Sequence, residues 1–148
     1  MRRRLLNVNM GRATFDAEFH NLDDIRDFVG EAAQQVGFSE KEIYSIQLAA
    51  DEASTNIIEH AYAGMEGGKL EVECTITGDE LKIVMRDRGK SFDPSGVPEP
   101  NVKADLSKRK IGGLGMYLMR QLMDDVHYET SSEMGNTLTM IKRKGDAG

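Results

Sequence analysis

Apolar residues recur along this chain at two spacings, which separate the predicted strands from the predicted helices. Every second residue is apolar where one face of a strand is buried, a pattern found near residues 13–19, 70–76, 81–85, 126–130 and 137–141. Apolar residues lie three or four positions apart on the buried face of a helix, a pattern found over residues 22–36, about 39–62 and about 112–124. The chain is therefore expected to contain both helices and strands.

Local signals support several of these boundaries. Gly37 stops the first helical pattern, because glycine readily adopts the left-handed conformation past a helix end. Residues 39–42, Ser-Glu-Lys-Glu, form a capping box that starts the second helix, and Gly78-Asp79 predicts the turn of a hairpin. Helices followed by mainly hairpin-connected strands predict an α+β fold, a two-layer sandwich.

Residues 87–110 follow neither spacing. This stretch contains all three prolines of the chain, together with glycines and many charged residues. An irregular segment of this length inside a domain is either disordered or functional, typically as a lid. We take residues from about 90 to 111 as the lid loop.

Composition narrows the class of protein. The length of 148 residues suits one domain, which we assign to residues 1–148. The net charge of −6 does not favour the phosphate backbone of nucleic acid, so we expect no direct nucleic-acid partner. No apolar run approaches the ~20 residues that cross a bilayer, and the basic start lacks the apolar region of a signal peptide. We therefore expect a cytoplasmic domain that does not bind membranes.

The sulfur-containing residues are predicted to be structural. Cys74 is the only cysteine, which excludes an intrachain disulfide and a cysteine-based metal cluster. It is in phase with apolar neighbours in its strand, so we expect a buried, inert thiol. Met116, Met119 and Met123 share a helical spacing and are interpreted as core residues rather than as a binding surface.

The first cluster that predicts chemistry lies on the second helix. Glu52 and Asn56 are four residues apart, so they share one helix face. A carboxylate can accept a proton from a hydroxyl group, and an amide oxygen is a hard ligand that suits Mg²⁺. The alternative interpretation is a solvated helix face.

Two further clusters contain glycine. Asp87 ends an apolar strand, where its carboxylate can accept a hydrogen bond from an amine such as that of adenine, and Gly89 lets a flat ligand approach. A simple turn is the alternative there. Gly112, Gly113 and Gly115 precede an amphipathic helix, whose N-terminus would bind phosphate. A flexible hinge is the alternative for these three glycines.

The order of these clusters resembles that of the GHKL (Bergerat-fold) ATPase superfamily. The resemblance covers residues from about 20 to 142, nearly the whole chain. Its motifs occur in the order of the superfamily: the N box at 52–62, the G1 box at 87–89, the G2 box at 113–115, and the last motif, Gly-Asn-Thr-Leu-Thr-Met, at 135–140. Four ordered motifs are far more specific than any one of them.

Within the superfamily, the chain most resembles the bacterial anti-sigma factor serine/threonine kinases. Glu52 lies one turn before Asn56, where a kinase of this branch needs its base, and the following His60-x-Tyr62 is typical of the branch. Residues 91–94, Ser-Phe-Asp-Pro, also match it, whereas many sensor kinases and chaperone ATPases have a second glycine at the first of these positions.

The resemblance implies a fold, two cofactors and a set of site residues. It implies helices over a mixed, mostly antiparallel sheet, with ATP bound between the helical layer and the lid. Glu52 would deprotonate a serine or threonine hydroxyl group of a partner, and Asn56 would hold Mg²⁺. The implied nucleotide contacts are Asp87, Gly89 and Thr137 at adenine, the amides of Gly113, Leu114 and Gly115 at the phosphates, and Lys108 and Arg109 at the γ-phosphate.

The resemblance also implies a function and its protein partners. The chain would be an ATP-dependent serine/threonine protein kinase and anti-sigma factor, which phosphorylates a STAS-type anti-anti-sigma protein and sequesters a sigma factor. A homodimer is compatible with the resemblance. One alternative is a nucleotide-binding regulatory module that sequesters a partner without phosphotransfer, and another is a detached catalytic domain that phosphorylates histidine. Glu52 favours the kinase, since a pure binding module needs no base.

Overall fold

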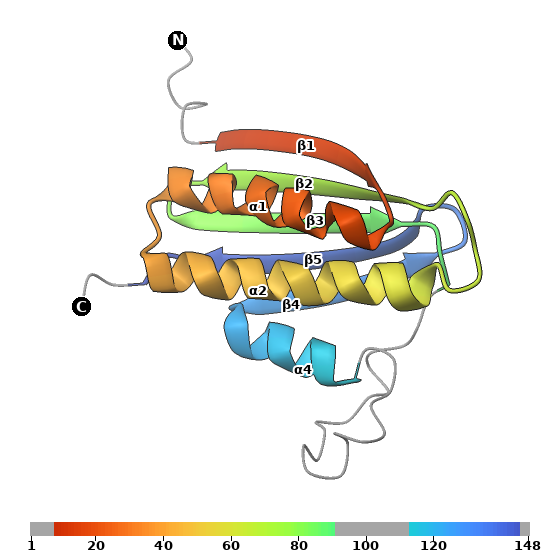
Figure 1. Cartoon of the computed structure of the whole chain (residues 1–148). Helices are drawn as coiled ribbons and strands as arrows, with labels where there is room; N and C mark the ends of the chain where they lie inside the picture. Colours follow the sequence, from red (N-terminus) through yellow and green to blue (C-terminus); the bar gives the residue numbers. More distant parts are fainter. Residues whose placement is uncertain (1–7, 91–112, 146–148) are drawn as a thin grey trace.

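A computed structural model describes residues 8–90 and 113–145 of the chain (Figure 1). The helical elements come from three separate parts of the sequence. They are a short 3₁₀ turn (Phe19–Asn21), α1 (Leu22–Val36), α2 (Glu40–Asn56), the π-helical turn η3 (Ile57–Ala61) and α4 (Gly113–Leu122). The strands are β1 (Val8–Asp16), β2 (Lys69–Thr77), β3 (Glu80–Asp87), β4 (Asp125–Ser131) and β5 (Gly135–Arg143).

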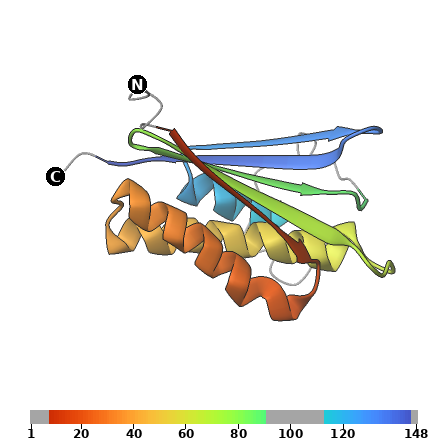
Figure 2. The ribbon, with the colours of Figure 1, turned by 90° about the horizontal axis from the view of Figure 1, so that it is seen from above.

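The strands form one sheet in the order β1-β2-β3-β5-β4. Every strand pairing within the described residues is antiparallel, so the sheet, which was expected to be mixed and mostly antiparallel, has no parallel pair there. Figure 2 shows α1, α2 and α4 on the same side of this sheet. The predicted α+β sandwich of two layers is confirmed.

The core lies between the sheet and the helices, because alternate strand residues point toward the helical layer. The inward positions of β2 and β3 are almost fully buried: Leu70, Val72, Cys74, Leu81, Ile83 and Met85. Burial raises the pKa of the Cys74 thiol to about 12, which agrees with the prediction of a buried, inert thiol. Asp87 continues the inward positions of β3 at the end of the strand and is itself 6% exposed.

The ends of the first two helices follow the predicted signals. Gly37 has φ +95° and ends α1 in the left-handed conformation. Ser39 Oγ accepts a hydrogen bond from the Glu42 amide at 3.1 Å, and Glu42 Oε1 accepts one from the Ser39 amide at 2.8 Å. These two bonds complete the capping box and hold the pKa of Glu42 below its ordinary value, the backbone bond from Ser39 having the largest effect.

Two boundaries differ from the sequence prediction. The strand expected at 13–19 begins at Val8. It ends at Asp16, because Asp16 is paired with Lys69, the first residue of its antiparallel partner β2. Phe19 is therefore 54% exposed, although it continues the alternation. The second helix was expected to continue to about Tyr62, but it widens into η3, where the Tyr62 amide donates to the Ile57 carbonyl at 3.1 Å.

No helix in the described part of the chain combines the length and the apolar character that a membrane span requires.

Candidate functional site

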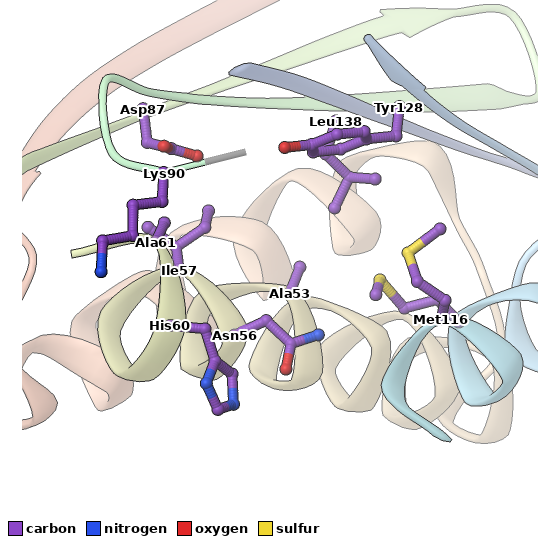
Figure 3. Close-up of a pocket in the computed structure, with 11 residues that line it drawn as sticks. Ala53, Asn56, Ile57, His60, Ala61, Asp87, Lys90, Met116, Tyr128 and Leu138 are labelled. Atoms are coloured by element: carbon purple, nitrogen blue, oxygen red, sulfur yellow. The ribbon is translucent and has the colours of Figure 1, made fainter. Parts of the chain in front are cut away.

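A cavity of about 150 Å³ lies between the helical layer and one end of the sheet (Figure 3). Its wall is mainly apolar, with a few polar side chains, as is usual for small-molecule sites. The lining residues are Ala53, Asn56, Ile57, His60, Ala61, Asp87, Lys90, Met116, Met119, Tyr128 and Leu138. The cavity therefore brings together Asn56 and Asp87, which are 31 residues apart in the sequence.

Asp87 lies on the sheet side of the cavity and is fixed by two hydrogen bonds. Its Oδ1 accepts from the Gly89 amide at 2.8 Å and from Asn136 Nδ2 at 2.7 Å. Burial raises the pKa of Asp87 above its ordinary value, and the two hydrogen bonds oppose this rise only in part. Oδ2 accepts no hydrogen bond within the described residues, so one carboxylate oxygen remains for a ligand.

Asn136 was not predicted to be a site residue, and it determines how Asp87 is held. The two residues are directly opposite in the β3–β5 pairing, and Asn136 is 2% exposed. Its Nδ2 also donates to the carbonyls of Gly89 at 3.0 Å and Lys90 at 3.3 Å, while its Oδ1 accepts from Thr130 Oγ1 at 2.8 Å. A sequence signal existed, because Asn136 is a polar residue in phase with the apolar positions of β5.

Thr137 does not line the cavity. Side chains alternate between the faces of a strand, so Thr137 lies on the face opposite to Asn136 and Leu138. Its partners in the sheet are Arg86 and Glu129. The residue of β5 that contacts Asp87 is therefore Asn136, and the contact of Thr137 with adenine stays a prediction.

Gly89 lies where two parts of the backbone meet. A Cβ atom at this position would overlap the carbonyl group of Ala61 in η3, and the same carbonyl accepts a hydrogen bond from the Lys90 amide at 2.6 Å. The sequence predicted that Gly89 gives clearance to a ligand. In the structure, the close approach is made by η3, so the glycine is needed for the packing of the protein itself.

Asn56 lies on the helical side of the cavity. Its Nδ2 is buried and has no hydrogen-bond partner in the described residues, which is unusual for a buried polar atom and indicates a missing partner. Figure 3 shows Asn56 and His60 on the helical side of the cavity and Asp87 on the sheet side. Glu52 lies one turn earlier in α2 and is half-buried, but it is not among the residues that line the cavity.

The predicted phosphate-binding residues lie partly within the described chain. Gly113, Leu114 and Gly115 form the first turn of α4, directly before Met116 in the cavity wall. Amides of a first helical turn have no partner in their own helix, which suits an anion. Lys108 and Arg109, the lid loop from residue 91 onward and the sequence of residues 91–94 lie outside the described residues.

Met116 and Met119 of α4 and Met123, directly after the helix, differ in their relation to the cavity. Met116 and Met119 are 2% and 1% exposed and are core residues, as predicted, but they also line the cavity. Met123 is 5% exposed and belongs to the core without lining the cavity. The distinction drawn from the sequence, between core and binding surface, therefore does not hold for the first two.

Comparisons with known proteins identify a family and several relatives. The model of the histidine kinase-like ATPase domain family matches residues 15–142. The serine-protein kinase RsbW of Listeria monocytogenes serovar 1/2a is 39% identical over 98 residues, which are 64% of this chain and 62% of that protein. The serine-protein kinase RsbW of Bacillus pumilus is 36% identical over 124 residues, which are 80% of this chain and 75% of that protein. The match thus spans about three fifths of the Listeria relative.

A crystal structure of the RsbU and RsbW domains of Rv1364c from Mycobacterium tuberculosis is similar to this fold. The TM-score is 0.64 with 21% sequence identity, and the alignment covers 91% of this chain and 32% of that one. At this identity, the likeness concerns the fold, and it agrees with the α+β architecture described above.

Proposed function

The chain belongs to the histidine kinase-like ATPase domain family, and from this premise we propose that it is an ATP-dependent serine/threonine protein kinase. The observation that carries the proposal is that one cavity contains both a buried acceptor, Asp87, and a buried donor without a partner in the described residues, Asn56 Nδ2. The names of the RsbW relatives, serine-protein kinases, support the same activity.

The described residues fit an adenine nucleotide. The free Oδ2 of Asp87 can accept a hydrogen bond from the amine of adenine, and it would repel the carbonyl group that guanine and hypoxanthine have at the same position. Apolar side chains such as Ile57, Met116 and Leu138 suit the faces of a flat base. The first turn of α4, Gly113–Gly115, suits the phosphates. ATP supplies the phosphoryl group when it is bound.

The residues also fit one Mg²⁺ ion shared with the nucleotide. No group of three or more His, Cys, Asp or Glu side chains within residues 8–90 and 113–145 is placed to hold a metal ion. Mg²⁺ usually keeps several waters and takes one or two protein oxygen ligands beside substrate phosphates, a role that Oδ1 of Asn56 would fill. When bound, the ion neutralises phosphate charge.

Glu52 is the proposed base. It would accept the proton of a serine or threonine hydroxyl group as that oxygen bonds to the γ-phosphorus of ATP, while the bond from this phosphorus to the β–γ bridging oxygen breaks and ADP leaves. Lys108 and Arg109 are proposed to neutralise charge on the γ-phosphate. Positioning and charge neutralisation are the main requirements of phosphoryl transfer, and this set of residues supplies both.

For the partners, we propose a STAS-type anti-anti-sigma protein as substrate and a sigma factor as the sequestered protein, in the cytoplasm and with a homodimer as the working form. This follows from the resemblance to the anti-sigma factor kinases. A regulatory module that binds ATP and sequesters its partner without phosphotransfer is the second candidate. The position of Glu52, one helical turn before Asn56, favours the kinase over this module.

Incubation with Mg-ATP and STAS-type proteins, followed by mapping of the modified residue, tests the activity. We expect acid-stable phosphoserine or phosphothreonine on the substrate. Glu52→Gln should lower the transfer rate by about 10²–10⁴-fold with nucleotide binding retained, because only the base is removed. Glu31→Gln, on the exposed side of α1, is the control and should transfer at the wild-type rate.

Each other outcome contradicts a distinct part of the proposal. Wild-type transfer by Glu52→Gln would exclude this residue as the base. Tight binding of Mg-ATP without transfer to any partner would favour the regulatory module. An acid-labile product would identify histidine as the acceptor.

A further inference from the structure

Tyr62 connects three segments at the end of the cavity. It directly follows η3, and it is 8% exposed. Its hydroxyl group donates a hydrogen bond to the Lys69 carbonyl at 2.7 Å and accepts one from the Arg88 amide at 2.8 Å. The ring packs against Gly68, where an added Cβ would lie 2.6 Å from the ring. Tyr62 therefore holds the beginning of β2 and the residue after Asp87 at the same time.

A second contact beside Tyr62 holds the same segment. The Lys90 amide donates to the Ala61 carbonyl at 2.6 Å, and the absent side chain of Gly89 makes room for this approach. Two consecutive residues, Ala61 and Tyr62, thus bind the amides on both sides of Gly89. The segment that follows Asp87 is fastened to the helix that carries Asn56.

The π-helical turn fixes the orientation of this connection. In η3, the Tyr62 amide donates to the carbonyl of Ile57, five residues earlier, instead of four as in an α-helix. The turn directly follows Asn56, so it sets the rotation of Tyr62 relative to Asn56. No other described side chain accepts a hydrogen bond from the Arg88 amide, and Tyr62 is therefore the side chain that relates the position of Asp87 to the helix.

We propose that the hydroxyl group of Tyr62 is a positioning group for purine selection: through the Arg88 amide, it holds Asp87 where its free oxygen meets the amine of adenine. The inference rests on the proposed function. The ring of Tyr62 and its bond to Lys69 serve the fold, whereas the bond to Arg88 serves recognition. Without the hydroxyl group, Asn136 still binds Oδ1 of Asp87, but the segment after Asp87 loses one of its two hydrogen bonds to Ala61 and Tyr62.

The test compares Tyr62→Phe with Tyr44→Phe, the same change at a tyrosine that is 66% exposed. Binding of Mg-ATP and of Mg-inosine triphosphate, which has a carbonyl group in place of the amine, is measured by calorimetry. Loss of one hydrogen bond should weaken ATP binding by about tenfold and inosine triphosphate binding by less than about twofold. The selectivity for ATP then falls by about fivefold or more, while kcat at saturating ATP stays within about twofold. Tyr44→Phe should match the wild type.

The other outcomes overturn the inference in distinguishable ways. Wild-type selectivity in Tyr62→Phe would exclude the positioning role. Equal weakening of both nucleotides, together with a lower melting temperature, would assign Tyr62 to the fold alone. A wild-type protein without preference for ATP would contradict adenine recognition by Asp87, and thus the proposed function itself.

A second variant keeps the test decisive if Tyr62→Phe does not fold. Gly68→Ala retains the hydroxyl group but displaces the ring, because the new Cβ would lie 2.6 Å from it. We expect the same loss of selectivity for ATP over inosine triphosphate. Gly11→Ala, whose Cβ would meet Phe28 at an ordinary 3.7 Å, is the matched control. Unchanged selectivity in Gly68→Ala would overturn the inference.

Discussion

At the scale of single residues, Asn136 shows how much one buried amide can determine. It donates to the Asp87 carboxylate and to the Gly89 and Lys90 carbonyls, and it accepts from Thr130. Its neighbour Thr137 lies on the other face of the same strand. The two positions therefore give a direct comparison of a site residue with an outer-face residue.

Asn136→Ala should destabilise the protein by about 1–3 kcal/mol, because it leaves several buried polar groups without a partner. ATP binding should weaken as well, since Asp87 loses the bond that orients it. Thr137→Ala should change stability by less than about 0.5 kcal/mol and leave ATP binding unchanged. Urea unfolding and calorimetry measure the two effects. The opposite ranking of the two variants would show that Thr137 is the site residue.

The raised pKa of Asp87 predicts how the stability of the fold depends on pH. Burial raises its pKa above the ordinary value of 3.8, so the folded protein binds a proton more tightly than the unfolded chain does. Stability contributed by this residue is then greatest at low pH and is lost as the pH rises from 3.8 through the raised folded-state value. Asp87→Asn removes this titration while the side-chain oxygen can still accept hydrogen bonds.

The stability of Asp87→Asn relative to the wild type should therefore increase as the pH rises through this window and then level off. Urea unfolding of both proteins at a series of pH values measures the difference. A difference that decreases as the pH rises would contradict the direction of the pKa shift. ATP binding should weaken in the variant, because an ionised acceptor is replaced by a neutral amide.

At the scale of elements, the packing of η3 against the end of β3 is the contact that places the site. The sequence predicted one continuous helix here, because the apolar pattern alone does not distinguish five-residue from four-residue hydrogen bonding. Gly89 carried the signal of a close approach, but the sequence could not identify the approaching group. The structure identifies it as the Ala61 carbonyl.

Gly89→Ala should cost about 1–3 kcal/mol, because its Cβ overlaps backbone atoms that cannot rotate away. Nucleotide binding should weaken too, since relief of the overlap separates η3 from the segment after Asp87. Thermal unfolding and calorimetry measure both effects, with Gly11→Ala as the control. Wild-type stability in Gly89→Ala would mean that η3 and this segment are not tightly packed.

Most elements were predictable because they carry redundant signals. The capping box of α2, Gly37 and the turn between β2 and β3 each agree with the apolar spacing around them. The end of β1 was not predictable, because Phe19 continues the apolar alternation although the pairing with β2 ends at Asp16 and Lys69. At the site, Asn56 and Asp87 could be predicted because each belongs to a motif whose side chains suit a ligand. Asn136 could not be predicted without knowing which face of β5 contacts Asp87.

At the scale of the whole molecule, ligand binding should appear as added stability. An excess of Mg-ATP, at about 100 times its Kd, should raise the free energy of unfolding by about 2.7 kcal/mol. Part of this gain should disappear on chelation of Mg²⁺. In Asn56→Ala, the gain should no longer depend on Mg²⁺, because the proposed metal ligand is missing.

Thermal unfolding with and without a chelator measures this dependence. Asn9→Ala, an exposed position in β1, is the control and should keep the wild-type response to Mg²⁺. An Asn56→Ala protein that responds to chelation as the wild type does would exclude Asn56 as the metal ligand.

Asp87 belongs to the middle strand of the sheet, and Asn56 belongs to the layer of helices above it. A ligand that binds both side chains therefore links the sheet to the layer of helices. A displacement of the helices relative to the sheet would break the contact of the ligand with Asp87 or with Asn56. A mechanical force or a binding protein that displaces the helices would therefore release the ligand without contacting it.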